Sequence, residues 1–498
     1  MIGETQPASK QAEKVRAKEI RQLKRGPKDT TVKVLLTDLL LSIASVPLGS
    51  RFVDTFNEMR CVQWFSKEEL HDRSERRLGL LLKHAAENVP YYRTLYRRLG
   101  LKPDELRTID DLKALPIFKK SLYRELDPET LCASGISSSL RIDRQTSGST
   151  GEPFQFSLDR RALPVIFASH LFYDSWHGQR PFDRYTRIVA PPAGQAPLAT
   201  DATAAVRMRR GITDGLQKFY ENRTQQKIWL SEVDVELAQN VWHRIEAFQP
   251  KFVMGYTSTL AAIANELLRC DLRLSRSVRG VIVIAETLTP NRRRLIHEYF
   301  AAPIINRYGL REFGSWSAQS CRESPNQFHI NTELVVYEVL RHDGTSCAAG
   351  EIGRVVLTDL HNFARPFIRY ETGDLAVAVS ENCSCSCGRG FPLFGPVEGR
   401  ALERLQTPSG GELNPTVLGH VLCHDNLEVV RQYQLVQEST DRVRLLVVPG
   451  PQWNEQQRAR IQSDLTRAIG AGVAVAVKTM SDIPPEKSGK RPIIKHAA

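Results

Sequence analysis

Short apolar runs rich in β-branched residues alternate with amphipathic helical stretches between residues 141 and 300. The clearest strand-like runs lie at residues 185–190, 252–254 and 281–285, and helical patterns follow two of them, at residues 259–268 and 291–300. Such alternation predicts a mostly parallel sheet flanked by helices. Because ligands of such sheets bind at the carboxyl ends of the strands, we expect Thr257, Glu286 and Tyr308 to face a binding site.

A long helix is predicted upstream of Pro90. Ser66 and Glu69 have the spacing of a capping box, in which the two side chains satisfy each other's backbone N–H groups. Apolar residues then recur at helical intervals, at Leu70, Leu78, Leu81, Leu82 and Ala85. Pro90 ends the pattern, and we expect the segment 89–93 that contains it to serve packing alone.

The pattern of apolar and polar residues changes in the later part of the chain. Residues 330–379 form strand-like runs, which predict a β-rich subdomain at about 330–400. Beyond a linker near Leu402 the pattern predicts strands at residues 429–436, 443–448 and 473–479 and a helix at residues 455–469. The predicted fold class is α/β, with mostly parallel sheets flanked by helices, the β-rich subdomain, and a small mobile α+β C-terminal domain. The predicted boundaries are a flexible basic segment at 1–30, a large domain at 31–400 and the small domain at 404–498.

Length and composition narrow these expectations. A chain of 498 residues exceeds one compact core, so about two or three domains are expected. The net charge of +12 suits an anionic ligand. Its basic clusters are accounted for as solvated helix faces, and without zinc-finger spacing or a basic motif interleaved with aromatic residues we expect no nucleic-acid partner. The apolar stretch at 32–47 is interrupted by Lys33 and Asp38, so no membrane span is expected. Nine cysteines without a paired framework predict reduced thiols in a cytoplasm.

A hydroxyl- and glycine-rich run is the first candidate for chemistry. Glycine lets successive backbone N–H groups converge on one anion, and Ser and Thr hydroxyls add donors, so the run predicts a phosphate-binding turn. An ordinary surface loop is the alternative, because the run lacks the Gly-Lys-Ser/Thr ending of a Walker loop. The expected phosphate-binding residues are Thr146, Ser147, Gly148, Ser149, Thr150 and Gly151.

Further motifs follow in a fixed order. They are Tyr308-Gly309-Leu310-Arg311-Glu312, Tyr370-Glu371-Thr372-Gly373-Asp374, Gly399-Arg400 and Ser488-Gly489-Lys490. With this ordered set the chain resembles the adenylate-forming, or AMP-forming, ligases from about Cys61 onward, and within them the phenylacetate–coenzyme A ligase family and its capsule-biosynthesis relatives. The resemblance implies ATP, Mg²⁺ and, as the expected acceptor, coenzyme A.

The resemblance also implies a role for each nucleotide-binding motif. Tyr308 is expected against the adenine, Asp374 on the ribose diol, and Arg400 near the ribose and phosphates. Gly309 and Glu286 are counted with these cofactor-binding residues. Outside this context, an Asp after Gly is most often a turn residue.

Two residues are assigned to the metal and phosphates. Glu312 is the expected magnesium ligand, because Mg²⁺ prefers a carboxylate together with phosphate oxygens and water. Thr150 is the hydroxyl expected near that metal. The alternative for Glu312 is a carboxylate at the start of a helix.

Lys490 is the expected catalytic lysine. An ammonium that reaches the bridging oxygen and the substrate carboxylate stabilises the transition state more than the ground state. A basic tail that includes Lys487 and Lys495 is the alternative, and Gly489 singles out Lys490. Relatives often carry an aspartate at the pivot of the small domain, whereas Glu403 is the nearest equivalent here. Many also carry a lysine where this chain has Glu152, which leaves no extra cationic phosphate contact at that position.

Cysteines crowd into one segment before the small domain. Cys383, Cys385 and Cys387 lie there, and Cys321 and His329 lie upstream. Tetrahedral zinc favours thiolates joined to a distant Cys/His pair, and some members of the family resemble this pattern. The predicted structural zinc ligands are Cys321, His329, Cys385 and Cys387, with Cys383 spare. Reduced surface thiols are the alternative.

The sequence thus predicts an AMP-forming acid–thiol ligase. Carboxylate and ATP would give an acyl-adenylate, and coenzyme A would take the acyl group. An aromatic or arylacetic acid is the expected substrate, by resemblance alone. Phe167, His170, Phe172, Tyr173, Tyr256 and Trp316 are possible pocket walls, though each is more often core. Alternatives are transfer to an amine, hydroxyl or carrier protein in polysaccharide or natural-product assembly, and a non-catalytic nucleotide-binding scaffold. The oligomeric state, monomer or homodimer, stays open.

Overall fold

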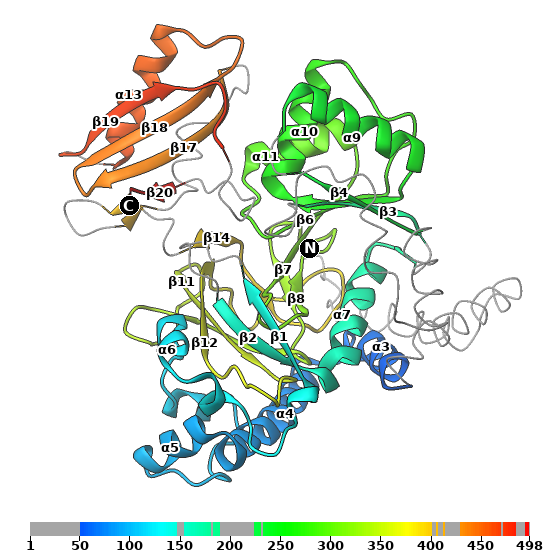
Figure 1. Ribbon diagram of the computed structural model, residues 1–498, viewed down its shortest axis with the longest axis vertical. Coiled ribbons are helices and arrows are strands. Elements are labelled where there is room, and N and C mark those ends of the chain that lie inside the picture. The colour runs from blue at the N-terminus through cyan, green and yellow to red at the C-terminus, as the bar shows by residue number, and fades with distance from the viewer. Residues whose placement is uncertain are drawn as a thin grey trace, which may run out of the picture.

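The computed structural model describes residues 50–146, 154–180, 183–189, 224–230, 233–400, 405–406, 412–413, 429–469, 472–484 and 494–497 (Figure 1). The α-helices are α3 (Ser50–Val62), α4 (Lys67–Asn88), α5 (Pro90–Leu99), α6 (Lys120–Glu125), α7 (Leu163–Ser175), α9 (Val235–Phe248), α10 (Thr257–Arg269), α11 (Pro290–Phe300) and α13 (Glu455–Ile469). Short 3-10 turns are η1 (Asp110–Ala114), η2 (Pro128–Leu131), η3 (Ser138–Leu140) and η4 (Arg160–Ala162). The strands are β1 (Arg141–Thr146), β2 (Phe154–Asp159), β3 (Tyr185–Val189), β4 (Gln225–Trp229), β5 (Phe252–Tyr256), β6 (Gly280–Ile284), β7 (Ile304–Gly309), β8 (Trp316–Gln319), β9 (Phe328–Ile330), β10 (Val335–Leu340), β11 (Ile352–Asp359), β12 (Tyr370–Val377), β13 (Leu393–Phe394), β14 (Val397–Arg400), β15 (Leu405–Gln406), β16 (Glu412–Leu413), β17 (Val430–Ser439), β18 (Arg442–Pro449), β19 (Ala474–Thr479) and β20 (Ile494–His496).

An eight-stranded sheet forms the centre, in the order β13-β9-β8-β7-β6-β5-β3-β4. The strands from β4 through β7 pair in parallel, and β8, β9 and β13 continue antiparallel. Helices α9, α10 and α11 cover one face, where their apolar side chains pack against Val253 and Val281 (Figure 1). The alternation of strands and helices predicted between residues 141 and 300 is therefore confirmed.

Smaller sheets account for the β-rich parts. The strands β10, β11, β12 and β14 form an antiparallel sheet, and β1 and β2 form a hairpin. Near the C-terminus, β17–β20 form a four-stranded sheet covered by α13, with a core of its own that includes Leu435, Leu445 and Leu465. The predicted α/β class, with a β-rich part and a small α+β unit, is confirmed. The apolar stretch at 32–47 and the linker near Leu402 lie outside the described residues.

Helix α4 begins where its capping box predicts. The Ser66 side chain accepts from the Glu69 backbone N–H at 3.2 Å, and the Glu69 carboxylate accepts from the Ser66 N–H at 2.8 Å. The helix ends at Asn88, and Pro90 then opens α5 at a position where its missing N–H costs nothing. Tyr92 is buried, as expected of a packing segment.

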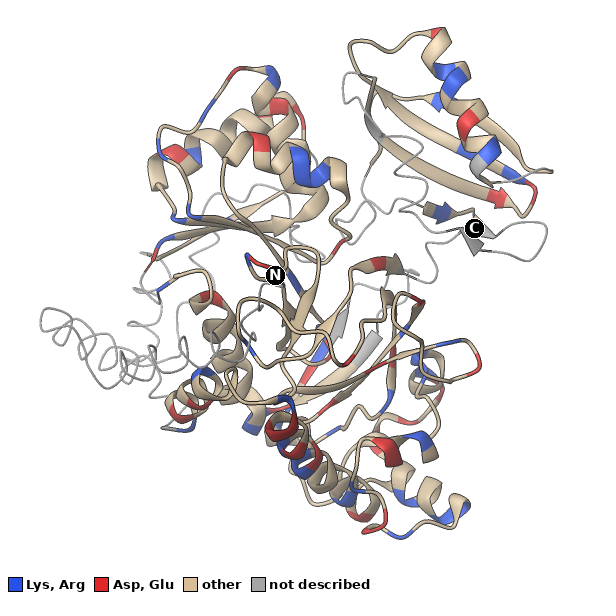
Figure 2. Ribbon diagram, turned by 180° about the vertical axis from the view of Figure 1, so that it is seen from behind, with Lys and Arg blue, Asp and Glu red and all other residues tan. Residues whose placement is uncertain are grey.

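Charged side chains of both signs are interspersed on the long surface helices. Figure 2 shows Lys and Arg next to Asp and Glu along α4 and α13. These helix faces therefore carry locally compensated charge, as expected of solvated surfaces. Within the part of the chain that the structure covers, no helix has the length and apolarity to cross a bilayer.

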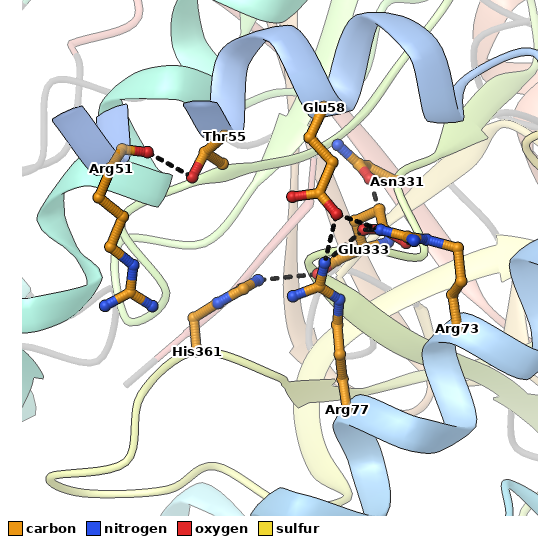
Figure 3. A network of polar contacts seen from close by, with 8 residues as sticks. All are labelled: Arg51, Thr55, Glu58, Arg73, Arg77, Asn331, Glu333 and His361. Atoms are coloured by element: carbon orange, nitrogen blue, oxygen red, sulfur yellow. Dashed lines mark hydrogen bonds and ion pairs between the residues drawn. The ribbon is translucent and has the colours of Figure 1, made fainter. Parts of the chain in front are cut away.

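A buried ion-pair network fastens α4 to the β-rich region (Figure 3). The Glu333 carboxylate accepts from the Arg73 Nε at 2.9 Å and Nη2 at 2.8 Å, and from the Arg77 Nη2 at 2.6 Å. Glu58 of α3 bonds to the same two arginines. The side chain of Glu333 is 3% exposed and that of Glu58 is 45% exposed, beside a cavity of about 300 Å³. The two carboxylates thus share partners but differ in burial.

We expect Glu333→Gln to destabilise the fold by about 2 kcal/mol, because the partly exposed guanidinium groups of Arg73 and Arg77 lose the buried carboxylate that accepts their charge-assisted hydrogen bonds. Burial raises the pKa of Glu333, but the bonds from Arg73 and the charge of Arg77 outweigh it, so the pKa lies below its ordinary value. The stabilisation is then present above the ordinary carboxyl pKa and is lost as the pH falls through the lower folded value. Urea unfolding at pH 7 and at acidic pH measures both effects.

Glu58→Gln is the matched control, because it removes an exposed carboxylate from the same arginines. It should cost less than about 1 kcal/mol. Equal losses in the free energy of unfolding for the two variants would show that the burial of Glu333 adds nothing to stability.

Candidate functional site

Tyr308 and Asp374 meet between two sheets. Tyr308 lies near the end of β7, and Asp374 lies in β12 after Gly373, whose φ of 81° suits glycine. The Tyr308 hydroxyl donates to the Asp374 Oδ2 at 2.8 Å. Burial and the neighbouring Asp374 carboxylate raise the pKa of Tyr308 well above its ordinary value, so the hydroxyl keeps its proton. The structure brings together two residues that are distant in sequence and were both assigned to a nucleotide.

Arg400 lies opposite Asp374. The antiparallel pairing of β12 with β14 makes these residues Cα partners. The backbone pairing therefore places Arg400 beside the Tyr308–Asp374 pair. The side chain of Arg400 is not among the parts that the structure describes.

Glu312 lies in a turn after β7 rather than at the start of a helix, and it is 7% exposed. The Tyr370 hydroxyl donates to its Oε1 at 3.2 Å. The Lys120 ammonium at the start of α6 lies 3.7 Å from the same oxygen. Burial and the Glu312 carboxylate raise the pKa of Tyr370 well above its ordinary value. A buried carboxylate with a cation beside it can serve a metal ion that also binds phosphate.

The hydroxyl-rich run begins at the end of β1. Thr146 pairs with Phe154 of β2, so the run starts where β1 ends. Residues Ser147, Gly148, Ser149, Thr150 and Gly151 lie outside the described residues, as do Glu152 and Lys490. Their assigned roles stay predictions.

Glu286 has partners at the start of α10. Its Oε2 accepts from the Ser258 N–H at 2.7 Å, and its Oε1 accepts from the Ser258 hydroxyl at 3.0 Å. The Thr257 hydroxyl donates to the Glu286 carbonyl at 3.2 Å, and Arg292 lies 3.8 Å from the carboxylate. A carboxylate at a helix start satisfies N–H groups that lack a helical partner. Glu286 therefore links the carboxyl ends of β5 and β6, whatever else it binds.

Gly309 is required by close packing. A Cβ there would lie 2.8 Å from the Ser315 carbonyl oxygen and 3.0 Å from the Trp316 ring. The backbone after Tyr308 thus passes directly against Trp316, and any side chain at Gly309 would force them apart.

A second constellation lies at the antiparallel edge of the large sheet. Ligand atoms of Cys321, His329, Cys385 and Cys387 all lie within 4.8 Å of one another. The sulfurs of Cys321 and Cys385 are 3.6 Å apart, and the Cys387 sulfur is 3.5 Å from the His329 Nε2. Two sulfurs bound to tetrahedral zinc at about 2.3 Å would be about 3.8 Å apart, so the donor set fits zinc.

The electrostatics of this cluster favour thiolate. The hydrogen bond from Cys321 and the contact with His329 lower the pKa of Cys387 to about 3, against the effect of burial. The bond to Cys387 raises the pKa of Cys321. The His329 Nδ1 lies 3.4 Å from the Phe391 carbonyl, which orients Nε2 toward the sulfurs. Cys383 is not part of the group, and the described cysteines form no disulfide.

Sequence reasoning missed Lys120 and Tyr370 as neighbours of Glu312. Tyr370 opens the Tyr-Glu-Thr-Gly-Asp motif, so the motif itself was the available signal. Lys120 had no such signal. It reaches the site because Phe118 pairs with the backbone of Arg369 and Glu371, a contact that only the folded chain reveals.

Comparisons with known proteins identify chains of similar sequence. The family model described as the CapK C-terminal domain matches residues 405–497. The phenylacetate–coenzyme A ligase of Thermus thermophilus is 26% identical over 373 residues, covering 74% of this chain and 78% of that protein. The Escherichia coli enzyme of the same name is 29% identical, covering 63% and 68%. Protein CapK of Staphylococcus aureus is 22% identical, covering 85% and 88%.

The fold has solved counterparts. A crystal structure of 2-hydroxyisobutyryl-CoA ligase in the postadenylation state superposes with a TM-score of 0.69 at 17% identity, covering 87% of this chain and 91% of that chain. An anthranilate CoA ligase superposes with a TM-score of 0.51 at 17% identity, covering 70% and 64%. The chain is thus a homologue of the phenylacetate–coenzyme A ligases and of CapK, and it has the fold of the adenylate-forming CoA ligases.

Proposed function

We propose that this protein activates a carboxylic acid with ATP and passes the acyl group to coenzyme A. The carboxylate oxygen attacks the α-phosphorus, and the bond to the oxygen that bridges to the β-phosphorus breaks, so pyrophosphate leaves. The sulfur of coenzyme A, its proton lost to solvent, then attacks the acyl carbon and AMP leaves. The observation that carries the proposal is the group of Tyr308, Asp374 and Glu312 at one edge of the sheet, in a homologue of phenylacetate–coenzyme A ligases.

The nucleotide would lie between β7 and β12. Asp374 offers carboxylate oxygens to the ribose diol, and Tyr308 offers its ring to the adenine. The hydrogen bond between Tyr308 and Asp374 holds both side chains in place before the nucleotide arrives. Arg400, opposite Asp374, would contribute positive charge near the ribose and phosphates.

The phosphates would lie between the 146–151 turn and Glu312. The hydroxyls and N–H groups of the turn bind phosphate oxygens, with Thr150 nearest the metal. Glu312 fits Mg²⁺ because it is a buried carboxylate, a ligand that this ion prefers together with phosphate oxygens and water. When bound at Glu312, Mg²⁺ would neutralise part of the phosphate charge. The Lys120 ammonium adds a second positive charge at the same place.

A structural zinc ion would fit Cys321, His329, Cys385 and Cys387. It would join strand β9 and the residues after β8 to the segment before β13. The zinc ion would cross-link these segments and would take no part in the reaction of the carboxylic acid. The expected cytoplasmic location, with reduced cysteines, accords with these thiols.

The acid is proposed to be aromatic or arylacetic. Phe172 and Tyr173 are fully buried and belong to the core. His170, Tyr256 and Trp316 are only partly buried. Trp316 lies against Gly309, His170 lies beside Trp316, and Tyr256 packs on the same apolar cluster as Trp316, so they fit walls for an acyl group. Transfer to an acceptor other than coenzyme A, or a scaffold without turnover, gains no support from the named relatives.

Pyrophosphate exchange across a panel of carboxylic acids, with and without coenzyme A, tests the proposal. We expect ATP-dependent exchange with at least one aromatic acid, and thioester plus AMP once coenzyme A is added. Exchange without thioester formation would indicate that the acyl group passes to an acceptor other than coenzyme A. No exchange with any acid would reject the ligase assignment.

Asp374→Asn should raise the KM for ATP roughly 10- to 100-fold, because a charged hydrogen-bond acceptor to the ribose is lost. Tyr308→Phe is the control, since it removes the bond to Asp374 while keeping the ring. Its effect should be several-fold smaller. If the two substitutions raise the KM equally, Asp374 acts through Tyr308 rather than on the nucleotide.

A further inference from the structure

One face of the central sheet carries two arginines. Arg187 in β3 is the Cα partner of Met254, and Arg307 in β7 is the partner of Ile284. Because paired residues share a face and side chains alternate along a strand, Arg187, Arg307 and Tyr256 lie on the same face. Helices α9, α10 and α11 cover the other face (Figure 1).

Aromatic side chains lie beside Arg307 on this face of the sheet. The rings of His170 and Trp316 lie 5.8 Å apart, and Phe167 lies 6.2 Å from His170. The His170 Nε2 contacts the Gly314 carbonyl at 3.0 Å, and burial lowers the pKa of His170 to about 4, so it is neutral at pH 7. Trp316 and Tyr256 pack on the same apolar cluster.

This group adjoins the proposed nucleotide site. The Trp316 ring lies against the Gly309 backbone, next to Tyr308. Tyr256 immediately precedes Thr257, which bonds to Glu286. An acyl group joined to the α-phosphate would then pass the Gly309 backbone and Trp316 toward Arg187.

The two arginines differ in their partners. Arg307 is 3% exposed, pairs with Asp174 at 2.6 Å, bonds to Gln319 and lies over the Trp316 ring. The Arg187 side chain is partly buried, and its Nε has no hydrogen-bond partner among the residues that the structure describes. Arg187 lies one strand away from Tyr256 on the same face of the sheet, and its positive charge opposes the rise that burial causes in the pKa of Tyr256.

A buried guanidinium N–H without an acceptor is costly, and a planar fork of donors matches a carboxylate best. We propose that Arg187 binds a second anionic group on the acyl part of the substrate, so that the acid is an aromatic acid whose ring bears an acidic substituent. The inference rests on the proposed ligase function and specifies its substrate class. Trp316 and His170 would hold the ring, and Arg187 would hold its acidic substituent.

Matched acids test this. Phenylacetate and carboxyphenylacetate differ only by a ring carboxylate, and the ratio of their kcat/KM values in pyrophosphate exchange reports the preference. The wild-type protein should favour carboxyphenylacetate, and Arg187→Met should lower the ratio roughly 10- to 100-fold, as expected for lost charge-assisted hydrogen bonds. Arg187→Lys should keep part of the preference.

Arg184→Met is the control variant, because Arg184 is exposed beside the same strand and lies over the Phe248 ring at 5.7 Å. It should leave the ratio unchanged. Thermal unfolding of each variant separates lost recognition from lost folding.

An unchanged ratio in a folded Arg187→Met protein, or a wild-type preference for phenylacetate, would overturn the inference and leave the ligase function standing. If no acid supports exchange, the ligase function fails. Calorimetric binding of the two acids in the presence of AMP then still judges Arg187: tighter wild-type binding of carboxyphenylacetate, lost in Arg187→Met, supports the inference, and equal binding rejects it.

Discussion

Lys490→Ala is expected to lower pyrophosphate exchange by on the order of 10²–10³-fold or more while leaving thioester formation from a supplied acyl-adenylate largely intact. The ammonium is proposed to stabilise charge that develops as the carboxylate attacks the α-phosphorus. An interaction made only in the transition state contributes to kcat rather than to substrate affinity. Separate assays of the two half-reactions, with the KM for ATP and acid measured in each, provide the test.

Lys487→Ala and Lys495→Ala are the matched controls. Lys495 lies in β20, where its backbone pairs with Val436. Both variants should retain exchange. Equal loss of the two half-reactions in Lys490→Ala, or similar loss in a control, would show that the tail lysines act through folding or general charge.

Cys387→Ser is expected to remove bound zinc and to destabilise the region around β9 and β13 by several kcal/mol, on the order of a lost structural cross-link. Serine is a weak zinc ligand, and three remaining donors hold a structural ion poorly. Elemental analysis of protein purified without chelator gives the zinc content, and thermal unfolding gives the stability.

Cys383→Ser is its control, because Cys383 lies in the same segment but outside the ligand group. It should keep both zinc and stability. Wild-type protein with far less than one zinc per chain would reject the metal site, and equal destabilisation by both variants would point to packing of the segment.

Local sequence patterns predicted most of the helices and strands, because capping residues and apolar spacing act over a few neighbouring residues. The capping box at Ser66 and the apolar spacing up to Pro90 define α4 nearly to the residue. The runs at 252–254 and 281–285 became the buried parallel strands β5 and β6, since burial on both faces requires continuous apolar residues. The register that places Arg187 beside Met254 could not be predicted, because it depends on pairing between distant segments.

The residues of the candidate site likewise divide into those that a sequence pattern predicted and those that only the tertiary structure reveals. The zinc donors and the pair of Tyr308 and Asp374 carried sequence signals, and the fold brings each set together. Lys120 and Arg187 carried none, since lysine and arginine are common surface residues and their positions beside the site appear only in the tertiary structure. The carboxylate of Glu286, assigned to the cofactor, is already bonded to the start of α10, which an isolated glutamate after a strand does not reveal.

The route of oxygen transfer tests the central claim most directly. The fastest-exchanging acid, labelled with ¹⁸O in its carboxylate, is turned over with ATP and coenzyme A, and the products are analysed by mass spectrometry. Attack of the carboxylate on the α-phosphorus leaves one labelled oxygen in AMP when the thioester forms. Unlabelled AMP, or ADP and phosphate as products, would contradict the formation of an acyl-adenylate.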